Sequence, residues 1–369
     1  MKERVVVVFG MGPAGLFLSR QLKRDGATVV AIGKSDDIGR YSNAISLFYE
    51  AESKPDVAKA VDCITTRFGE KLEAWICSDQ YLTLFIEEYP EAFSLMNFKN
   101  PGEGILRLIA EKEALMDYCS GIGVRFPEQY SADSLRDVEY PVAIKPNIKH
   151  GTSPIKKINF AENENDLKLL LSFAGQHNLA SSQLIIQKAI VGDNGSEYGY
   201  GGYFLDGEVV NDVYFIQARQ YPQGVCCYTV ELTDVDLKRE IAEQTHKLIR
   251  ALKYSGFIQF DLKKDANSHK MYVLDINPRP WGSVSMLTKK CWQNGVFEPN
   301  PDIDERICWR FPIKELMAFS NKNNVSYSKC SKMKSGNKYI TMVDLWDKHD
   351  IKPFLMQPVI TIKKLIKRV

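Results

Sequence analysis

The chain has 369 residues, 44% of them hydrophobic and 25% charged, which is typical of a soluble globular protein with two or three packed domains. Its 48 basic residues nearly balance its 46 acidic residues, so the overall charge excludes a strong general attraction to nucleic acid. The eight cysteines include no CxxC pair and the five histidines are scattered. This disfavours a zinc site and predicts reduced thiols in a cytoplasmic protein.

The first hundred or so residues alternate between apolar strands and helices, the pattern of a parallel βαβ sheet. Strands are predicted at Val5–Phe9, 28–32 and 72–77, and helices from Pro13 onward and over 80–88. We therefore expect a Rossmann-like domain over residues 1–108.

The turn after the first strand carries Gly10, Gly12 and Gly15, the spacing of a dinucleotide-binding fingerprint. An NAD- or FAD-dependent oxidoreductase is therefore an alternative function. Such proteins hold the ribose with an acid about twenty residues further on, at the end of the second strand. Here that strand ends in Gly33 and Lys34, with no acid. We interpret the three glycines as residues that mainly allow tight packing of strand and helix.

The middle of the chain is predicted to form two α+β lobes. A helix over 104–119 is followed by strands at 140–146 and 155–160, a helix over 164–177, a strand at 184–187, a hairpin of 197–205 and 208–218, a helix from Thr233 to about 252, and strands at 256–262 and 271–276. Asp206 and Gly207 between the hairpin strands are typical of a tight turn, and Thr233 is a candidate helix cap. We place a domain at 109–320, with a small lobe at about 135–192 and a large lobe at about 193–320.

Residues 321–369 are predicted to be a C-terminal extension with a basic tail. From residue 351 onward the tail has five basic residues and no acid, interleaved with apolar residues. This pattern indicates a short basic amphipathic helix. We expect it to pack on the body of the protein, and contact with a membrane surface is the alternative.

The strands at 256–262 and 271–276 carry the most informative pattern. Because side chains alternate along a strand, Gln259 and Asp261 share one face. Asp275 and Asn277 likewise share a face of the second strand. Antiparallel pairing would gather carboxylate and amide oxygens in one cluster, the ligands that Mg²⁺ prefers. We expect one or two Mg²⁺ ions there, or Mn²⁺ in their place, with Gln259 and Asp261 as alternatives for the first ligand.

Arg279 follows this cluster directly. Pro278 and Pro280 on either side end the strand and fix the backbone. The guanidinium is thereby aimed at the oxygen cluster, an arrangement suited to phosphoryl transfer.

The segment 258–283 resembles the metal-binding hairpin of the ATP-grasp enzymes, in which an acid or Gln, then an acid and a hydrophobe, precede Asn-Pro-Arg. Gln259 resembles the version in carbamoyl phosphate synthetase, and Asp275 stands where the family usually has Glu. The resemblance implies an ATP-grasp fold, mixed α/β and α+β, with an N-terminal Rossmann-like (pre-ATP-grasp) domain. It implies ATP and Mg²⁺ as cofactors and Arg279 as a catalytic residue.

Other motifs of this chain resemble those of the ATP-grasp enzymes and occur in the same order along the sequence. Lys145, at the end of the strand at 140–146, resembles the phosphate-contacting lysine, and Lys112 resembles the second phosphate lysine. The loop with Gly151, Thr152 and Ser153 offers backbone N–H groups and hydroxyls to a γ-phosphate.

The segment 185–193 resembles the interlobe hinge, where the backbone reads the adenine edge. The resemblance implies nucleotide contacts from Gln187, Lys188, Ala189, Ile190 and Asp193. Lys188 stands where the family often has a ribose-binding Glu, so Asp193 is the candidate substitute.

Arg219 resembles the arginine that many relatives use on a phosphate or a substrate carboxylate. A structural role is the alternative for it.

The resemblance implies an ATP-dependent ligase that activates a carboxylate as an acyl phosphate and joins it to an amine. The pattern is closest to the carboxylate–amine ligase branch, which includes D-aspartate ligase, so an amino acid or a cell-surface glycan precursor is the expected substrate. A homodimer is common among such enzymes. A non-catalytic ATP-binding regulator is the remaining alternative; Lys188 and Asp275 motivate it, and Lys145, Asn277 and Arg279 argue against it.

Overall fold

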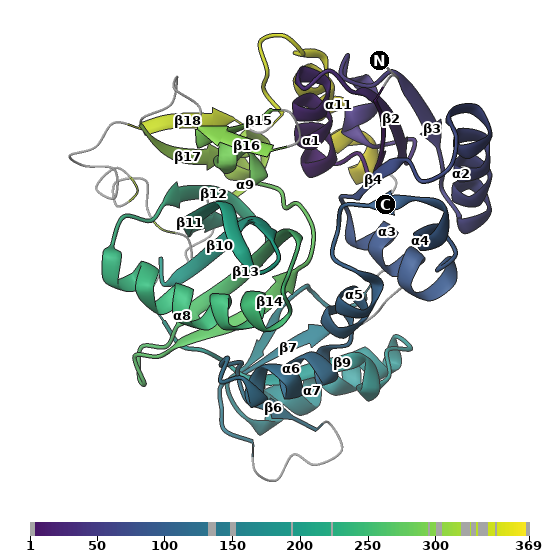
Figure 1. Cartoon of the computed structure of the whole chain (residues 1–369). Coiled ribbons are helices and arrows are strands. Elements are labelled where there is room, and N and C mark those ends of the chain that lie inside the picture. Colours follow the sequence, from purple (N-terminus) through teal and green to yellow (C-terminus); the bar gives the residue numbers. More distant parts are fainter. Residues whose placement is uncertain are drawn as a thin grey trace.

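The computed structural model describes residues 4–131, 138–147, 153–192, 195–222, 224–293, 296–299, 305–318, 325, 330, 339–343 and 345–366, with the backbone alone over 289–299 and 363–366. The chain forms three lobes (Figure 1): an N-terminal lobe, a small lobe and a lobe built on a long sheet. In the part of the chain covered by these ranges, no helix is both long and apolar enough to cross a membrane.

The N-terminal lobe is a five-stranded sheet in the order β3-β2-β1-β4-β5, and its strands all pair in parallel. Its strands are β1 (Val5–Phe9), β2 (Thr28–Gly33), β3 (Leu47–Glu50), β4 (Glu73–Ile76) and β5 (Asn97–Phe98). Its helices are α1 (Pro13–Arg24), the 3₁₀ turn η1 (Ile38–Tyr41), α2 (Lys54–Phe68), α3 (Asp79–Thr83), the π-helical turn η2 (Leu84–Glu88) and α4 (Ala92–Leu95). The central strands are buried on both faces, which explains their continuous apolar runs. The predicted Rossmann-like lobe is confirmed.

The glycine-rich turn after β1 is used for packing. A Cβ on Gly15 would lie 2.0 Å from the carbonyl oxygen of Gly10, so only glycine allows α1 this close to the turn. The backbone N–H of Met11 donates to Asp37, and its carbonyl accepts from Gly39 in η1. Because η1 covers the turn in this way, the glycines do not present an open anion site. This agrees with the structural interpretation of the three glycines.

The small lobe is a four-stranded antiparallel sheet in the order β6-β9-β7-β8. Its elements are β6 (Gln129–Tyr130), β7 (Val142–Pro146), β8 (Asn159–Ala161), α7 (Glu164–Gln176), the 3₁₀ turn η3 (Ser181–Gln183) and β9 (Leu184–Lys188). The helices α5 (Glu103–Ala110) and α6 (Lys112–Gly121) come before this lobe in the chain, and Ile109, Leu115 and Cys119 pack in the core of the third lobe.

Two predictions for residues 103–161 are wrong in detail. The single helix predicted over 104–119 is two helices, because Glu111 has an extended backbone (φ −92°, ψ 93°) that ends α5 and starts α6. The strand predicted over 155–160 is confined to β8, since only residues from Asn159 onward pair with β7. The break at Glu111 is not marked by a proline or a glycine, so tertiary contacts decide it.

The third lobe is built on a seven-stranded sheet in the order β14-β13-β10-β11-β12-β17-β18. Its elements are β10 (Glu197–Leu205), β11 (Glu208–Gln220), β12 (Cys226–Glu231), α8 (Val235–Ala251), β13 (Gly256–Lys264), β14 (Met271–Asn277), the 3₁₀ turn η4 (Val284–Lys289), β17 (Arg306–Arg310), α9 (Pro312–Met317) and β18 (Tyr339–Val343), with the separate pair β15 (Lys290–Gln293) and β16 (Val296–Pro299). The predicted hairpin turn is confirmed, with positive φ at Asp206 and Gly207. The predicted cap of α8 is wrong by one residue: Asp234, not Thr233, accepts the first backbone N–H groups.

The N-terminal lobe packs directly on the large sheet. Trp75 of β4 lies against Tyr203 and Phe257, with ring centroids 6.2 and 5.6 Å apart, and these residues share one apolar core. The two lobes therefore form a continuous interface that fixes the position of the N-terminal lobe beside β13.

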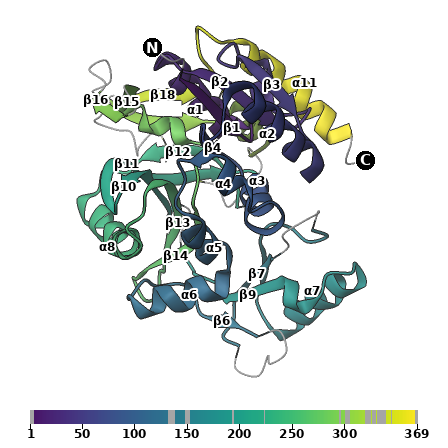
Figure 2. The ribbon, with the colours of Figure 1, turned by 45° about the vertical axis from the view of Figure 1, so that its right-hand side comes forward.

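Some of the C-terminal residues join the large sheet, and others pack on the N-terminal lobe. β18 adds to the large sheet in parallel with β17. The last helix, α11 (Lys352–Ile366), lies on the N-terminal lobe (Figure 2), where Ile360 packs with Leu16 and Ile38. The expected packing of the basic helix on the body of the protein is thus present.

A buried network fastens this segment to the N-terminal lobe. Arg20 of α1 donates to the carboxylate of Asp350 at 2.8 Å and to the carbonyl of Leu345 at 3.1 Å. The hydroxyl of Ser42 and the N–H of Asn43 also donate to Asp350. Burial would raise the pKa of Asp350, but these hydrogen bonds and the Arg20 charge outweigh it and lower the pKa.

We predict that Asp350→Asn destabilises the protein by about 3 kcal/mol near neutral pH, because it leaves the buried Arg20 with only the more distant carboxylate of Asp347, at 4.0 Å, as a charge partner. Since the folded-state pKa of Asp350 is depressed, its contribution is present above the ordinary Asp pKa and is lost as the pH falls through the lowered value. Urea unfolding at several pH values measures this, and the gap between the two proteins should narrow in acid. The matched control is Arg24→Gln, which breaks an exposed ion pair with Asp347 and should cost less than about 1 kcal/mol. Equal costs for both variants would contradict the prediction.

Candidate functional site

The antiparallel pairing of β13 and β14 brings the predicted metal-binding side chains together. Gln259 lies opposite Asn277, and Asp261 lies opposite Asp275. The amide of Asn277 donates to Gln259 at 2.7 Å, and the amide of Gln259 donates to Asp261 at 2.6 Å. All four oxygen-bearing groups therefore lie on one face of the sheet.

The two carboxylates of this cluster lie on paired residues of neighbouring strands, and only Asp275 lines the cavity. Burial raises the pKa of Asp261, and the neighbouring charge of Asp275 raises it further. Hydrogen bonds from Gln259 and from Gln217 of β11, the latter at 2.5 Å, oppose this rise. A divalent cation would relieve the repulsion between the two carboxylates.

Two carboxylates and two amides fit Mg²⁺, which needs few protein ligands when substrate phosphates supply the rest. In the described parts of the chain, no three His, Cys, Asp or Glu side chains gather into a site of their own. The donor set thus suits a hard cation that is shared with a phosphorylated ligand. Asp275 and Asn277 line the open cavity, whereas Gln259 and Asp261 lie beneath them in the sheet.

Arg279 joins this cluster to the N-terminal lobe. Its guanidinium donates twice to the carboxylate of Asp79, at the start of α3, and approaches Asn277 Oδ1 at 3.4 Å. Burial would lower the pKa of Arg279, but the charge of Asp79 outweighs it and raises the pKa. Two residues later, Trp281 packs over Gly201, where a Cβ would come within 2.6 Å of the indole. This contact holds the backbone that carries Arg279.

Lys145 lies on β7, on the opposite wall. Its ammonium group is 3.5 Å from both the side-chain oxygen of Gln187 and the carbonyl of Leu274, which are long contacts for a charged donor. Burial lowers the pKa of Lys145, and the nearby Asp275 carboxylate opposes this shift. The side chain is thus a buried cation able to accept an anionic ligand.

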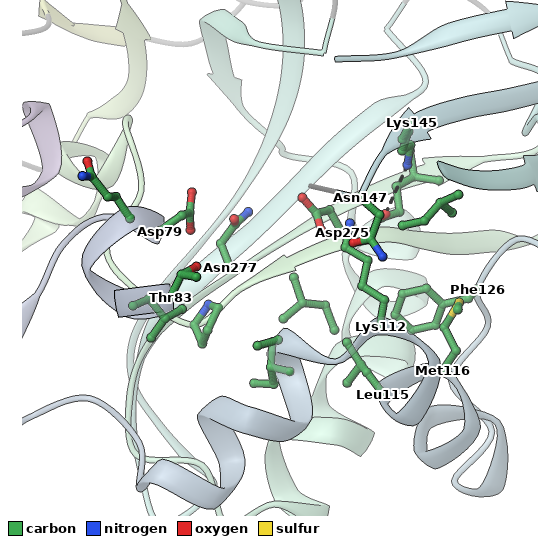
Figure 3. A pocket seen from close by; sticks show the side chains of 18 of the residues that line it. Asp79, Thr83, Lys112, Leu115, Met116, Phe126, Lys145, Asn147, Asp275 and Asn277 are labelled. Carbon is green, nitrogen blue, oxygen red and sulfur yellow. Dashed lines mark hydrogen bonds between the residues drawn. The ribbon is translucent and has the colours of Figure 1, made fainter. Parts of the chain in front are cut away.

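The predicted groups meet in one cavity of about 730 Å³ between the three lobes. Figure 3 shows Lys112 and Lys145 on one side and Asn277 with Asp79 on the other, with Asp275 between them. Lys112 is the first residue of α6, so the break at Glu111 places it at the cavity wall. Of the predicted site residues, the cavity is lined by Lys112, Lys145, Gln187, Asp275 and Asn277.

Other lining residues were not identified from the sequence. An apolar wall at one end consists of Ile109, Leu115, Met116, Phe126, Ile185, Leu274 and Ile276. Asn147 follows Lys145 by two residues, and this spacing in an extended chain was a usable signal. At the other end the N-terminal lobe contributes Lys34, Asp79, Gln80, Leu82 and Thr83. Their contribution could not be read from the sequence, because the lobe packing that brings them here is non-local.

The predicted hinge residues contact their neighbours instead of the cavity. Lys188 pairs with Glu139 through its side chain, and its backbone N–H donates to Glu128. The N–H of Ala189 donates to Pro141, and Ala189 and Ile190 are buried behind the cavity wall. Gln187 is the one residue of this described stretch, 187–190, that lines the cavity.

Three predicted residues of the phosphate and ribose contacts, Gly151, Thr152 and Asp193, lie outside the described residues. Ser153 is described, and its hydroxyl accepts the N–H of Ile155 at 3.1 Å in a local turn.

Arg219 does not reach the cavity, contrary to the prediction. Irregular pairing of β11 with β12 on both sides of Arg219 interrupts the alternation of side chains there. The guanidinium is buried and donates to the carbonyls of Ala318 and Val325 at 3.0 and 2.9 Å. The alternative, a structural role, describes this residue.

Comparisons with known proteins agree with this geometry. Residues 109–283 match the family model described as an ATP-grasp domain. No curated protein sequence matches the chain. Among solved structures, N5-carboxyaminoimidazole synthetase from Staphylococcus aureus in complex with ADP is 19% identical, with a TM-score of 0.57, over 79% of this chain and 74% of that one. An L-amino acid ligase from Bacillus licheniformis is 14% identical, with a TM-score of 0.60, over 79% of this chain and 71% of that one. At these identities the likeness concerns the fold.

Proposed function

We infer that the chain is an ATP-dependent ligase of the ATP-grasp superfamily, and on this premise we propose that it joins a carboxylate to an amine through an acyl phosphate. The observation that carries the proposal is one cavity in which two lysines, an oxygen cluster at Asp275 and Asn277 and an apolar wall meet. The same elements are separated along the chain by more than a hundred residues, so only the folded protein assembles them.

ATP is proposed to lie along this cavity. The apolar wall around Met116 and Phe126 offers a surface for a planar base. Lys112 and Lys145 are then placed for the phosphates, and the buried Lys145 gains the anionic partner that its long contacts lack. Asp275 and Asn277, with Gln259 or Asp261 behind them, are placed to hold Mg²⁺ or Mn²⁺. The bound ion would neutralise charge on the triphosphate.

The proposed reaction requires positioning and charge neutralisation rather than a protein nucleophile. A carboxylate oxygen of the substrate attacks the γ-phosphorus, and ADP leaves. The amine nitrogen then attacks the acyl carbon, loses a proton and expels inorganic phosphate, which leaves an amide. Arg279, oriented by Asp79, is placed beside the cluster to stabilise negative charge that develops in both steps.

The end of the cavity at the N-terminal lobe is proposed to hold the carboxylate substrate. Lys34 supplies a cation at this end of the cavity, and Gln80 and Thr83 add polar groups. We propose an amino acid or a cell-surface glycan precursor as the substrate, in line with the resemblance to carboxylate–amine ligases. A homodimer and a cytoplasmic location are proposed on the same basis.

The direct test is ADP release by the purified protein with Mg²⁺, ATP and a panel of amino acids and amines. We expect release that requires both a carboxylate and an amine, together with one amide product detected by mass spectrometry. Release that no pair stimulates, or amide formation without ATP, would contradict the proposal.

Lys34 offers a test of where each substrate binds. We predict that Lys34→Met leaves the KM for ATP within about twofold and raises the KM for the carboxylate about tenfold or more, because the cation touches only the far end of the cavity. Steady-state kinetics with each substrate varied in turn measures both values. The control is Lys112→Met, for which the KM for ATP should change. A large effect of Lys34→Met on ATP alone would place the nucleotide in the N-terminal lobe.

A further inference from the structure

Helix α11 has apolar residues on two opposite faces. One face is buried on the N-terminal lobe through Pro353, Gln357 and Ile360. The opposite face is exposed: Ile351 just before the helix, Leu355, Val359 and Ile362 retain 42%, 60%, 42% and 56% of their accessible surface. At about 100° per residue these four positions fall within an arc of about 80°, so they form one continuous stripe. We call this set the α11 stripe.

The α11 stripe is unusual for a surface helix. Single exposed apolar residues are common on proteins, but a contiguous row of them marks a contact surface. The packed face already supplies the apolar contacts that hold α11 on the lobe, through Leu16 and Ile38. The stripe therefore contributes nothing to this packing.

The charge of the same segment indicates what would cover the stripe. Residues 351–369 hold five of the chain's 48 basic residues and none of its 46 acidic residues. The nearest acids before the helix, Asp347 and Asp350, are already paired with Arg24 and Arg20. An apolar stripe on a helix with a net positive charge is complementary to a surface that has an outer layer of negative charge over an apolar interior.

We propose that the α11 stripe docks on an anionic lipid surface. A second copy of the chain fits less well, because a two-fold interface would bring the same patch against itself and place two positively charged helices side by side. A lipid surface accepts the apolar side chains between its head groups, and its negative charge attracts the lysines. This surface is separate from the cavity, so the inference does not depend on the proposed reaction.

The test is sedimentation of the full-length protein with vesicles of phosphatidylcholine, with and without about 30% phosphatidylserine. We expect binding to the anionic vesicles only, weakened at least about fivefold by raising the salt from about 0.1 to 0.5 M. Leu355→Asp should weaken binding about tenfold or more, and so should Lys363→Glu combined with Lys364→Glu. Leu169→Asp on α7 is the matched control, since Leu169 is 70% exposed on a helix of the small lobe, and should bind like the parent.

Each variant is also examined by circular dichroism and light scattering. Binding to neutral and anionic vesicles alike, or unchanged binding by folded Leu355→Asp, would overturn the proposal. A dimer that Leu355→Asp dissociates would overturn it as well, because the stripe would then be an interface between copies of the chain.

Discussion

Replacing Asn277 with alanine is expected to lower the rate of ADP release at saturating substrates by about 100-fold or more, while the protein stays folded. The side chain lies in the cavity, supplies a predicted oxygen ligand and orients Gln259 through a 2.7 Å hydrogen bond. Loss of the Asn277 side chain removes one predicted ligand and takes away the hydrogen bond that orients a second one, Gln259. The backbone pairing of β14 with β13 does not involve the side chain, so the sheet should persist.

The matched control for this variant is Asn267→Ala, in the exposed turn of the same hairpin. Coupled detection of ADP and a thermal unfolding curve for both variants separate lost catalysis from lost structure. Near-normal turnover of Asn277→Ala would remove the hairpin from the mechanism.

Arg279→Ala is expected to lower turnover to a similar degree, about 100-fold or more, because a buried guanidinium beside the oxygen cluster would act on the transition state. Asp79, its partner in the N-terminal lobe, is 67% exposed and is placed to orient it rather than to react. We therefore expect Asp79→Ala to keep more activity than Arg279→Ala.

Kinetics of the two single variants and the double variant test this assignment. If Arg279 acts on the reacting groups, the double variant should be as slow as Arg279→Ala, and Asp79→Ala alone should be faster. Equal losses in both single variants would show instead that the pair serves as a bridge between lobes, in which case the catalytic role assigned to Arg279 is wrong.

The cluster of oxygen-bearing side chains on β13 and β14 was predictable because it depends on local rules. Alternation along a strand places Gln259 with Asp261 and Asp275 with Asn277, and a short polar turn forces the two strands to pair. The parallel N-terminal sheet was likewise visible in its apolar runs. Lys145 could be assigned because its neighbours in β7 alternate in the same way.

The remaining features depend on long-range contacts. The irregular pairing around Arg219 and the break at Glu111 carry no glycine or proline that would mark them. The places of Lys34 and Asp79 at the cavity follow from packing between the N-terminal lobe and β13, through residues such as Trp75. Such packing has no signature in a short stretch of sequence, so the part of the cavity lined by the N-terminal lobe emerged only from the structure.

The most direct test of the account is a crystal structure with Mn²⁺ and a non-hydrolysable ATP analogue, with the manganese located by its anomalous scattering. The account predicts manganese bonded to Asp275 and Asn277 at about 2.2 Å, beneath the triphosphate and within reach of Lys145. Manganese bound elsewhere, or a nucleotide held at the glycine turn after β1, would contradict it.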